Sequence, residues 1–271
     1  MKISLNKVQT FSIICVISIL LVLMVSCTYK LNDTPTLAEK LHTANVDILK
    51  DTLIKFRAKG GAYIIMNTTK DKVIDQHFIQ MPEDFSIWSY NVLRLFNYAV
   101  GMNKGIIKED EKIVFNNNER TLFDRIPKLE KESYLTPYVI SDYSYPLRLL
   151  QAYVRLFKNK DKYLTKSELA VLQKAVSENV KTGVARAANI DGFNVSGLTS
   201  TTESKEDSNE VYTLFIGQFQ IKRQNYAIIT ILDEPQKIKA TFNFNSSGWN
   251  SVPFAASLMR SLAEIDPKGR I

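Results

Sequence analysis

An uncharged, apolar run stands near the start of the chain. Lys2 and Lys7 precede a stretch from Val8 to Tyr29 that is dominated by Ile, Leu and Val. About 20 such residues in a helix cross the hydrocarbon core of a bilayer. Positive residues before such a run stay in the cytoplasm, so we expect the chain after residue 30 to face the periplasmic side of a bacterial inner membrane.

Residues 1–30 therefore predict a membrane anchor or a lipoprotein signal. Met24-Val25-Ser26-Cys27 is compatible with a lipoprotein cleavage box, in which Cys27 is the candidate lipidation site. Met24 is a poor residue for that box, so we favour the uncleaved anchor. Both alternatives tether the rest of the chain to a membrane.

The pattern after the anchor predicts one α+β domain. The polar residues 31–45 predict a linker, and residues 46–271 predict the domain. Apolar positions at helical spacing predict helices over 46–56, 92–100, 147–157, 169–180 and 252–262. Runs rich in β-formers predict strands over 62–66, 72–74, 211–219 and 226–232. This order favours an antiparallel sheet flanked by helices, with a helical insertion between its first and last hairpins.

Composition and charge exclude several classes of function. Of the net charge of +7, Lys2, Lys7 and Lys30 supply +3, which leaves +4 for residues 31–271. Acids and bases alternate there without a basic stripe, so nucleic acid is not an expected partner. The two cysteines, Cys15 and Cys27, lie in the apolar run, which leaves the domain without a disulfide or a thiol nucleophile.

The histidines give no sign of a metal site. The chain has two, His42 and His77, far apart in sequence and without a carboxylate at ligand spacing. A metal centre built on histidine, or a serine-protease triad, is therefore not expected, and no cofactor is predicted.

Five stretches of the chain have local sequence patterns whose order along the chain is informative. They are residues 62–75, 90–110, 144–159, 183–202 and 213–235. In this order they resemble the transpeptidase domain of class B penicillin-binding proteins, which shares its fold with the serine β-lactamases. The resemblance implies a penicillin-binding-protein fold and a connection with peptidoglycan synthesis.

The first catalytic motif of that family is not retained. Its Ser-x-x-Lys places an amine one helical turn from the hydroxyl that it activates. The matching positions here are Asn91 and Arg94. A carboxamide is not an acyl acceptor, and a guanidinium does not give up its proton to act as a base. The Ser-x-Asn motif, expected between Arg94 and Pro146, does not occur there.

The third motif, Lys-Thr-Gly, is matched by Leu198, Thr199 and Ser200. The cation that holds the substrate carboxylate is lost, while Thr199 and Thr201 keep hydroxyl groups. The resemblance therefore implies a vestigial site made of Asn91, Arg94, Leu198, Thr199, Ser200 and Thr201. A groove is expected between the edge strand at 198–202 and the helix that starts at Asn91. There, Arg94 either pairs with a ligand carboxylate or faces solvent.

Literal copies of the motifs occur elsewhere. Lys181-Thr182-Gly183 ends a predicted helix, and Ser89-Tyr90-Asn91 stands where the first motif belongs. Ser4 and Lys7 form the one literal Ser-x-x-Lys, on the cytoplasmic side of the anchor. None of the three is expected to be functional.

Three functions remain open at this point. The first is a membrane-tethered pseudo-transpeptidase that binds a peptidoglycan stem peptide or cell-wall synthesis proteins without catalysis. The second is an active D,D-transpeptidase or carboxypeptidase with an unrecognised hydroxyl nucleophile. Its candidates are Ser86, Ser89, Ser200 and Thr201. The third is an envelope lipoprotein adaptor of unrelated fold.

Overall fold

The computed structural model describes residues 34–88, 90–108, 143–203, 211–236 and 245–271. The predicted membrane segment, the lipidation candidate Cys27 and the nucleophile candidate Ser89 lie outside these residues. Within them, every helix is too short or too polar to cross a membrane.

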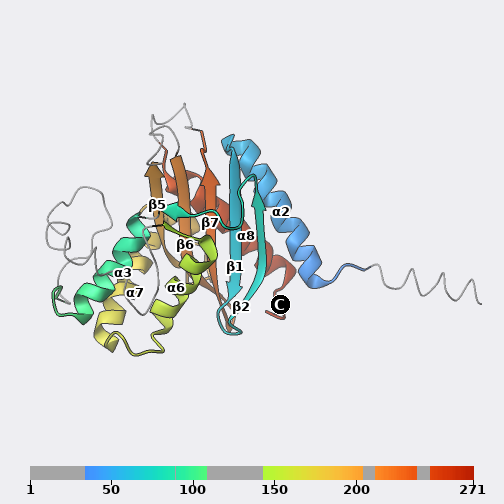
Figure 1. The fold of residues 1–271 in the computed structure, drawn as a ribbon. Coiled ribbons are helices and arrows are strands. Elements are labelled where there is room, and N and C mark those ends of the chain that lie inside the picture. Colours follow the sequence, from blue (N-terminus) through green and yellow to red (C-terminus); the bar gives the residue numbers. More distant parts are fainter. Residues whose placement is uncertain (1–33, 89, 109–142, 204–210, 237–244) are drawn as a thin grey trace, which may run out of the picture.

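A five-stranded antiparallel sheet forms the centre of the domain (Figure 1). Its strand order is β2-β1-β7-β6-β5, so β5 is an edge strand. The strands are β1 (Gly60–Asn67), β2 (Lys72–Ile79), β5 (Ser196–Glu203), β6 (Val211–Ile221) and β7 (Gln224–Asp233). A separate two-stranded ladder joins β3 (Ile87–Trp88) to β4 (Tyr143–Ser144).

Helices cover both faces of the sheet (Figure 1). One face carries α2 (Leu37–Phe56) and α8 (Ser251–Ile265), which pack against each other. The other carries α3 (Tyr90–Asn103), α6 (Pro146–Lys158) and α7 (Lys166–Lys181). Short 3-10 helices, η1 (Arg186–Ala188) and η2 (Ser247–Trp249), lie near α8.

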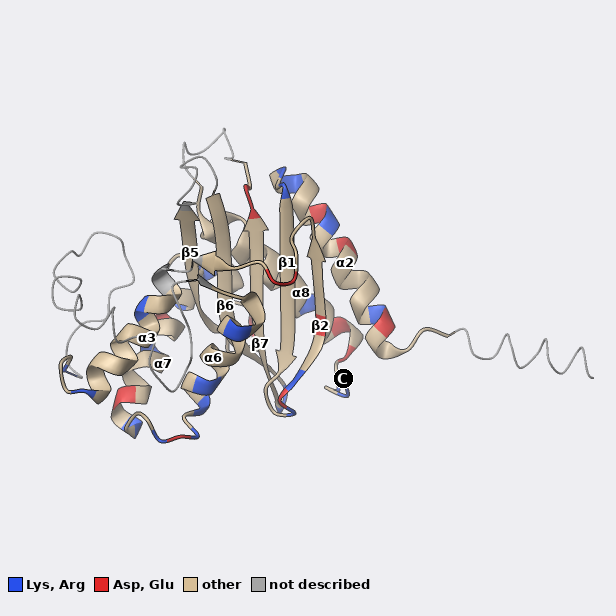
Figure 2. Ribbon diagram, in the orientation of Figure 1, with Lys and Arg blue, Asp and Glu red and all other residues tan. Residues whose placement is uncertain are grey.

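Strand β1 shows why the sheet is covered on both sides. Successive side chains of a strand point to opposite faces. Ala62 and Ile64 belong to the apolar cluster under α3, α6 and α7, and Tyr63 and Ile65 belong to the cluster under α2 and α8. All residues of β1 are buried. Charged residues of both signs lie mainly on the surrounding helices and turns (Figure 2).

The predicted α+β class, an antiparallel sheet flanked by helices with a helical insertion, is confirmed. The predicted boundary between a 31–45 linker and a domain from 46 is wrong. Helix α2 begins at Leu37, where the Thr36 hydroxyl and the Glu39 carboxylate form a capping box. Leu41 and Asn45 are fully buried, so this first part of the helix is part of the core.

The helix end at Lys181-Thr182-Gly183 is also confirmed. Lys181 is the last residue of α7, and the Thr182 amide bonds back to the Glu178 carbonyl. A Cβ on Gly183 would lie 2.7 Å from the Asn179 carbonyl oxygen, so close backbone approach requires glycine there. The literal copy of the third motif is thus a helix terminus.

Candidate functional site

The site expected from the sequence lies where α3 packs against the edge strand β5. Asn91 lies in the first turn of α3. Arg94, three residues later, is only 7% exposed. The alternative that Arg94 faces solvent is therefore wrong. Its buried guanidinium stands at the position where the resemblance places the catalytic lysine.

Strand β5 presents its even-numbered residues to the α3 side. Leu198 is 1% exposed and lies in the same apolar cluster as Val92 and Leu95 of α3. Ser200 and Thr202, further along this face, are 2% and 5% exposed. All three side chains are thus buried on this face of β5. Leu198, which the sequence resemblance matches to the lysine of Lys-Thr-Gly, is a residue of the core.

The odd-numbered residues of β5 face the opposite layer. Thr199 pairs in the ladder with Phe215, a residue of the cluster under α2 and α8. The Thr201 Oγ1 lies 2.7 Å from the Ser247 Oγ of η2, and Ser247 donates to the Ser200 carbonyl at 2.6 Å. The vestigial site predicted from the resemblance combines Thr199 and Thr201 with Leu198 and Ser200. The sheet separates these pairs onto two faces.

The hydroxyl groups of β5 contact other hydroxyl groups. The Ser200 Oγ lies 3.2 Å from the Thr202 Oγ1, and Thr201 pairs with Ser247 as above. A nucleophilic serine needs a base such as an amine or imidazole within hydrogen-bond reach, and a second hydroxyl does not serve. Ser86, another candidate, is exposed in the segment before β3, apart from β5.

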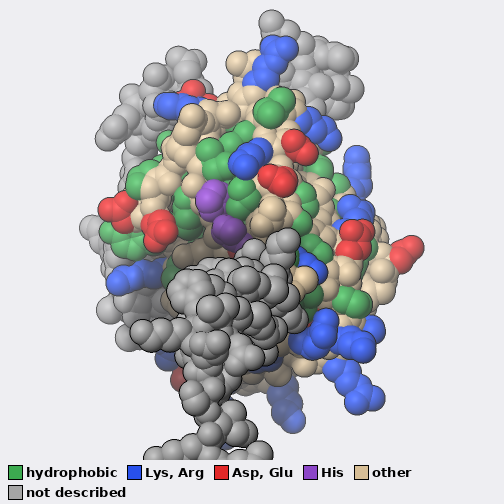
Figure 3. Space-filling model, turned by 90° about the vertical axis from the view of Figure 1, so that its right-hand side faces the viewer, with side chains coloured by type: hydrophobic (Ala, Val, Ile, Leu, Met, Phe, Trp, Pro, Cys, Tyr) green, Lys and Arg blue, Asp and Glu red, His purple; other side chains and the backbone are tan. Residues whose placement is uncertain are grey.

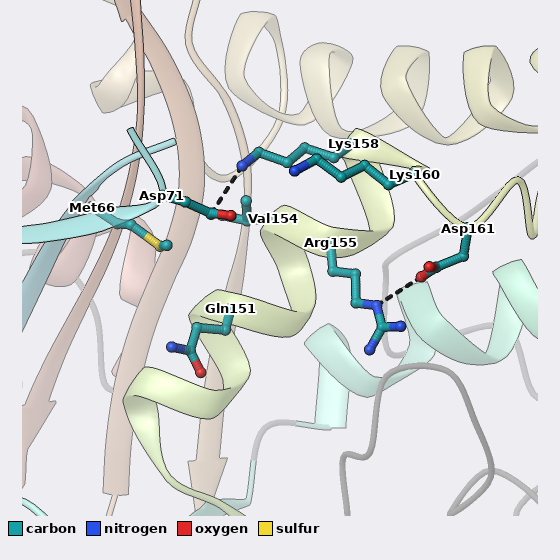
Figure 4. Close-up of a pocket in the computed structure, with 8 residues that line it drawn as sticks. All are labelled: Met66, Asp71, Gln151, Val154, Arg155, Lys158, Lys160 and Asp161. Carbon is teal, nitrogen blue, oxygen red and sulfur yellow. Dashed lines mark hydrogen bonds and ion pairs between the residues drawn. The ribbon is translucent and has the colours of Figure 1, made fainter. Parts of the chain in front are cut away.

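A cavity of about 430 Å³ lies at a different place, between the β1–β2 turn and α6 (Figure 4). It is lined by Met66, Asp71, Gln151, Val154, Arg155, Lys158, Lys160 and Asp161. None of the six predicted site residues lines it. Sequence reasoning missed this cavity because the charged and polar residues within 155–161 are typical of a solvated helix end.

Four of the residues that line this cavity form two ion pairs. The Lys158 Nζ lies 2.9 Å from the Asp71 Oδ1, and the Arg155 Nε lies 2.8 Å from the Asp161 Oδ2. The hydrogen bond from Lys158 lowers the pKa of Asp71. The acids thus neutralise two of the three cations, and the cavity keeps a small positive excess at Lys160.

Sequence reasoning also missed a buried polar cluster between α2 and the β1–β2 hairpin. The Asp75 carboxylate accepts from Asn45 Nδ2 at 2.6 Å and from Tyr63 OH at 2.9 Å. His42 Nδ1 lies 2.7 Å from its other oxygen. Burial and the Asp75 charge raise the pKa of Tyr63.

The two histidines, expected to be unrelated, lie side by side at this cluster. Their ring centroids are 5.4 Å apart, and Figure 3 shows both at the surface. The pKa of His77 is lowered by burial and by the neighbouring His42. The alternation of Asp75 and His77 along one strand face was the available signal. Across the described part of the chain, no three His, Cys, Asp or Glu side chains converge on one point that could hold a metal ion.

The chain is similar to known proteins in structure but not in sequence. No family profile matches the chain, and no curated protein sequence matches it. Solved structures do match. The transpeptidase domain of the FtsI4 D,D-transpeptidase from Legionella pneumophila matches with a TM-score of 0.62 at 13% identity, covering 82% of this chain and 96% of that one.

Two further structures agree. The transpeptidase domain of penicillin-binding protein 3 from Burkholderia pseudomallei matches with a TM-score of 0.62 at 12% identity, covering 83% of this chain and 94% of that one. A peptidoglycan synthetase from Bifidobacterium adolescentis gives a TM-score of 0.67 at 10% identity, covering 85% of this chain and 60% of that one.

The domain therefore has the fold of the transpeptidase domains of penicillin-binding proteins. The resemblance inferred from the order of local sequence patterns is confirmed at the level of fold. The alternative of an envelope adaptor of unrelated fold is wrong. At identities of 10–13%, these structural matches show the fold alone, and the activity has to be argued from the chemistry of the site.

Proposed function

We propose that this chain is a membrane-tethered, periplasm-facing pseudo-transpeptidase that takes part in peptidoglycan synthesis by binding rather than by catalysis. One observation supports the proposal: Arg94 and Leu198, the residues that the sequence resemblance matches to the two motif lysines, are both buried. The first is a cation that stays protonated, and the second is an apolar residue of the core.

The chemistry of acyl transfer supports this proposal. The reaction needs a nucleophile, a base that takes its proton, and a cation that holds the substrate carboxylate. At the matching positions, Asn91 offers no nucleophile, Arg94 offers no base, and Leu198 offers no charge. The fold is thus kept while each chemical component of the site is replaced.

The short connection to the anchor indicates where a partner lies. Only residues 30–36 separate the predicted membrane segment from helix α2, which starts at Leu37. Fully extended, they reach at most about 25 Å. The domain then works close to the bilayer, within reach of another anchored cell-wall synthesis protein or of a lipid-linked stem peptide. We propose that the partner is one of these two, the anchored protein or the lipid-linked stem peptide.

A fluorescent β-lactam tests the absence of catalysis. The full chain, in membranes, is incubated with the probe and separated on a denaturing gel beside an active penicillin-binding protein. We expect no covalent band from this chain. A band that disappears when the protein is denatured before labelling would show an active acyl-transfer site. Ser86→Ala, Ser89→Ala, Ser200→Ala and Thr201→Ala variants would then locate the nucleophile.

The mode of tethering is tested separately. Cells are fed an alkynyl fatty acid, and the wild-type chain is compared with a Cys27→Ser variant. An unlabelled chain of full length supports the uncleaved anchor that we favour. Label that is lost in the variant shows lipidation at Cys27 instead and contradicts that choice.

A further inference from the structure

The contact between His42 and His77 joins two elements that meet only in the folded protein. His42 lies on α2 and His77 on β2, the outermost strand beside α2. Their ring centroids are 5.4 Å apart, with the planes at 78°. Two imidazoles bound at about 2.0–2.1 Å to one tetrahedral metal ion have centroids about 5 Å apart. The observed separation already suits such an ion.

Asp75 fixes the orientation of the first ring. A carboxylate oxygen accepts hydrogen bonds, so we assign the Nδ1–H of His42 as the donor to Asp75 Oδ1 over 2.7 Å. The Nε2 of His42 then carries the lone pair that a metal needs. Asn45 and Tyr63 hold the same carboxylate in place. A carboxylate behind a histidine in this way is the usual second partner of a metal-binding imidazole.

The position of the pair gives an ion access. The side chain of His42 is 48% exposed, whereas that of Asp75 is 3% exposed. Asp75 is therefore placed to orient His42 and not to contact an ion from solvent. The pair also lies side by side on the molecular surface (Figure 3).

We propose that His42 and His77 form a binding site for a divalent transition-metal ion of the class that imidazole favours, with Zn²⁺ as the representative. Since no third such side chain converges there among the described residues, water completes the coordination. The ion links α2 to the edge of the sheet. An ion that binds only the folded chain stabilises it by mass action, so Zn²⁺ also raises the thermal midpoint of unfolding.

The test is unusually clean because the chain has no other histidine. The full chain, in detergent, carries a purification tag without histidine and the Cys15→Ser and Cys27→Ser substitutions, which remove the thiols. Zn²⁺ is titrated against a fluorescent zinc indicator, and the nitrogens of both rings are followed by NMR. We expect one ion per chain, micromolar affinity, and Zn²⁺-induced shifts at one ring nitrogen of each histidine.

Substitutions then separate ligands from their support. His42→Gln and His77→Gln should each lower the affinity by more than about tenfold, and Asp75→Asn, which disturbs orientation only, by about tenfold. Asp47→Asn, an exposed carboxylate on the same helix, should leave it unchanged. Circular dichroism confirms that each variant folds. Absence of Zn²⁺ binding, or equal affinity in the variant that lacks both histidines, overturns the proposal.

Discussion

Replacing Asp75 with alanine should cost the domain a large part of its stability. The carboxylate accepts hydrogen bonds from Asn45, Tyr63 and His42, and its side chain is 3% exposed. Alanine removes every acceptor at once. His42 is half exposed and can turn to water, whereas Asn45 and Tyr63 are fully buried and cannot.

The magnitude follows from the two donors left behind. A buried donor that loses its partner costs about 1–3 kcal/mol, which gives a loss of about 2–6 kcal/mol for Asn45 and Tyr63 together. Removal of the carboxylate also removes its own cost of burial, which offsets part of this loss. We therefore expect a decrease of about 3 kcal/mol in the free energy of unfolding, against a total of about 5–15 kcal/mol for a typical domain.

Urea denaturation, followed by far-ultraviolet circular dichroism of the full chain in detergent, measures this difference. Asp47→Ala is the matched control, because Asp47 lies on α2 with its side chain 64% exposed and forms a surface ion pair with Lys50. The control should change stability by less than about 1 kcal/mol. If Asp75→Ala and Asp47→Ala unfold at the same urea concentration, the buried cluster contributes nothing and the reasoning is wrong.

Three further predictions concern other parts of the fold. Burial raises the pKa of Tyr226 to about 12, so tyrosinate forms more easily in the unfolded chain than in the folded one. Stability should therefore fall as the pH rises above about 10, and an unchanged urea midpoint between pH 9 and 11 would contradict this. Leu198→Lys places a charge in an apolar cluster and should lower the free energy of unfolding, measured with urea, by about 3 kcal/mol, whereas Leu198→Met should leave it nearly unchanged. Equal losses of stability in the two variants would refute the core role of this position. Ser247→Ala removes the two bonds of the Ser247 hydroxyl, to the Thr201 hydroxyl and to the Ser200 carbonyl, and leaves the bond from the Ser247 amide to Thr201 Oγ1. The variant should lose about 1–2 kcal/mol by the same assay, and a midpoint equal to the wild-type value would show that the hydroxyl bonds add no stability.

The sequence predicted those elements in which periodicity and burial agree. On α6, the predicted stripe of Leu147, Leu150, Val154 and Phe157 packs against the core, with Leu150 and Val154 buried and the two outer residues partly buried. The start of α2 was missed because Leu37 and Leu41 are separated mostly by polar residues and the polar Asn45 takes the next position of the stripe, so the pattern there is typical of a linker. Its capping box at Thr36 and Glu39 was the signal that the periodicity did not contain.

The candidate site was harder to predict because its geometry depends on tertiary contacts. The order of the sequence patterns matched Asn91, Arg94 and Leu198 to the family's motifs, but it did not show on which face of β5 each hydroxyl group lies. The alternation of a strand separates Thr201 from Ser200, which no motif match reveals. The Asp75 cluster depends on tertiary contacts as well, because it joins Asn45 and His42 of α2 to a strand residue that follows them by 30 and 33 positions.

The position of β1 sets the order in which the sheet can be assembled. Its residues pair on one side with β2, close in sequence, and on the other with β7, where Gly60 faces Asp233. Synthesis delivers β1 early and β7 near the end, and β1 has no polar face to turn toward water in the meantime. Closure of so long a loop is slow, and the waiting hairpin is prone to aggregation. Chains cut short before residue 224 should therefore be insoluble, and the newly made protein should depend on chaperones that shield this hairpin until its partner strand arrives.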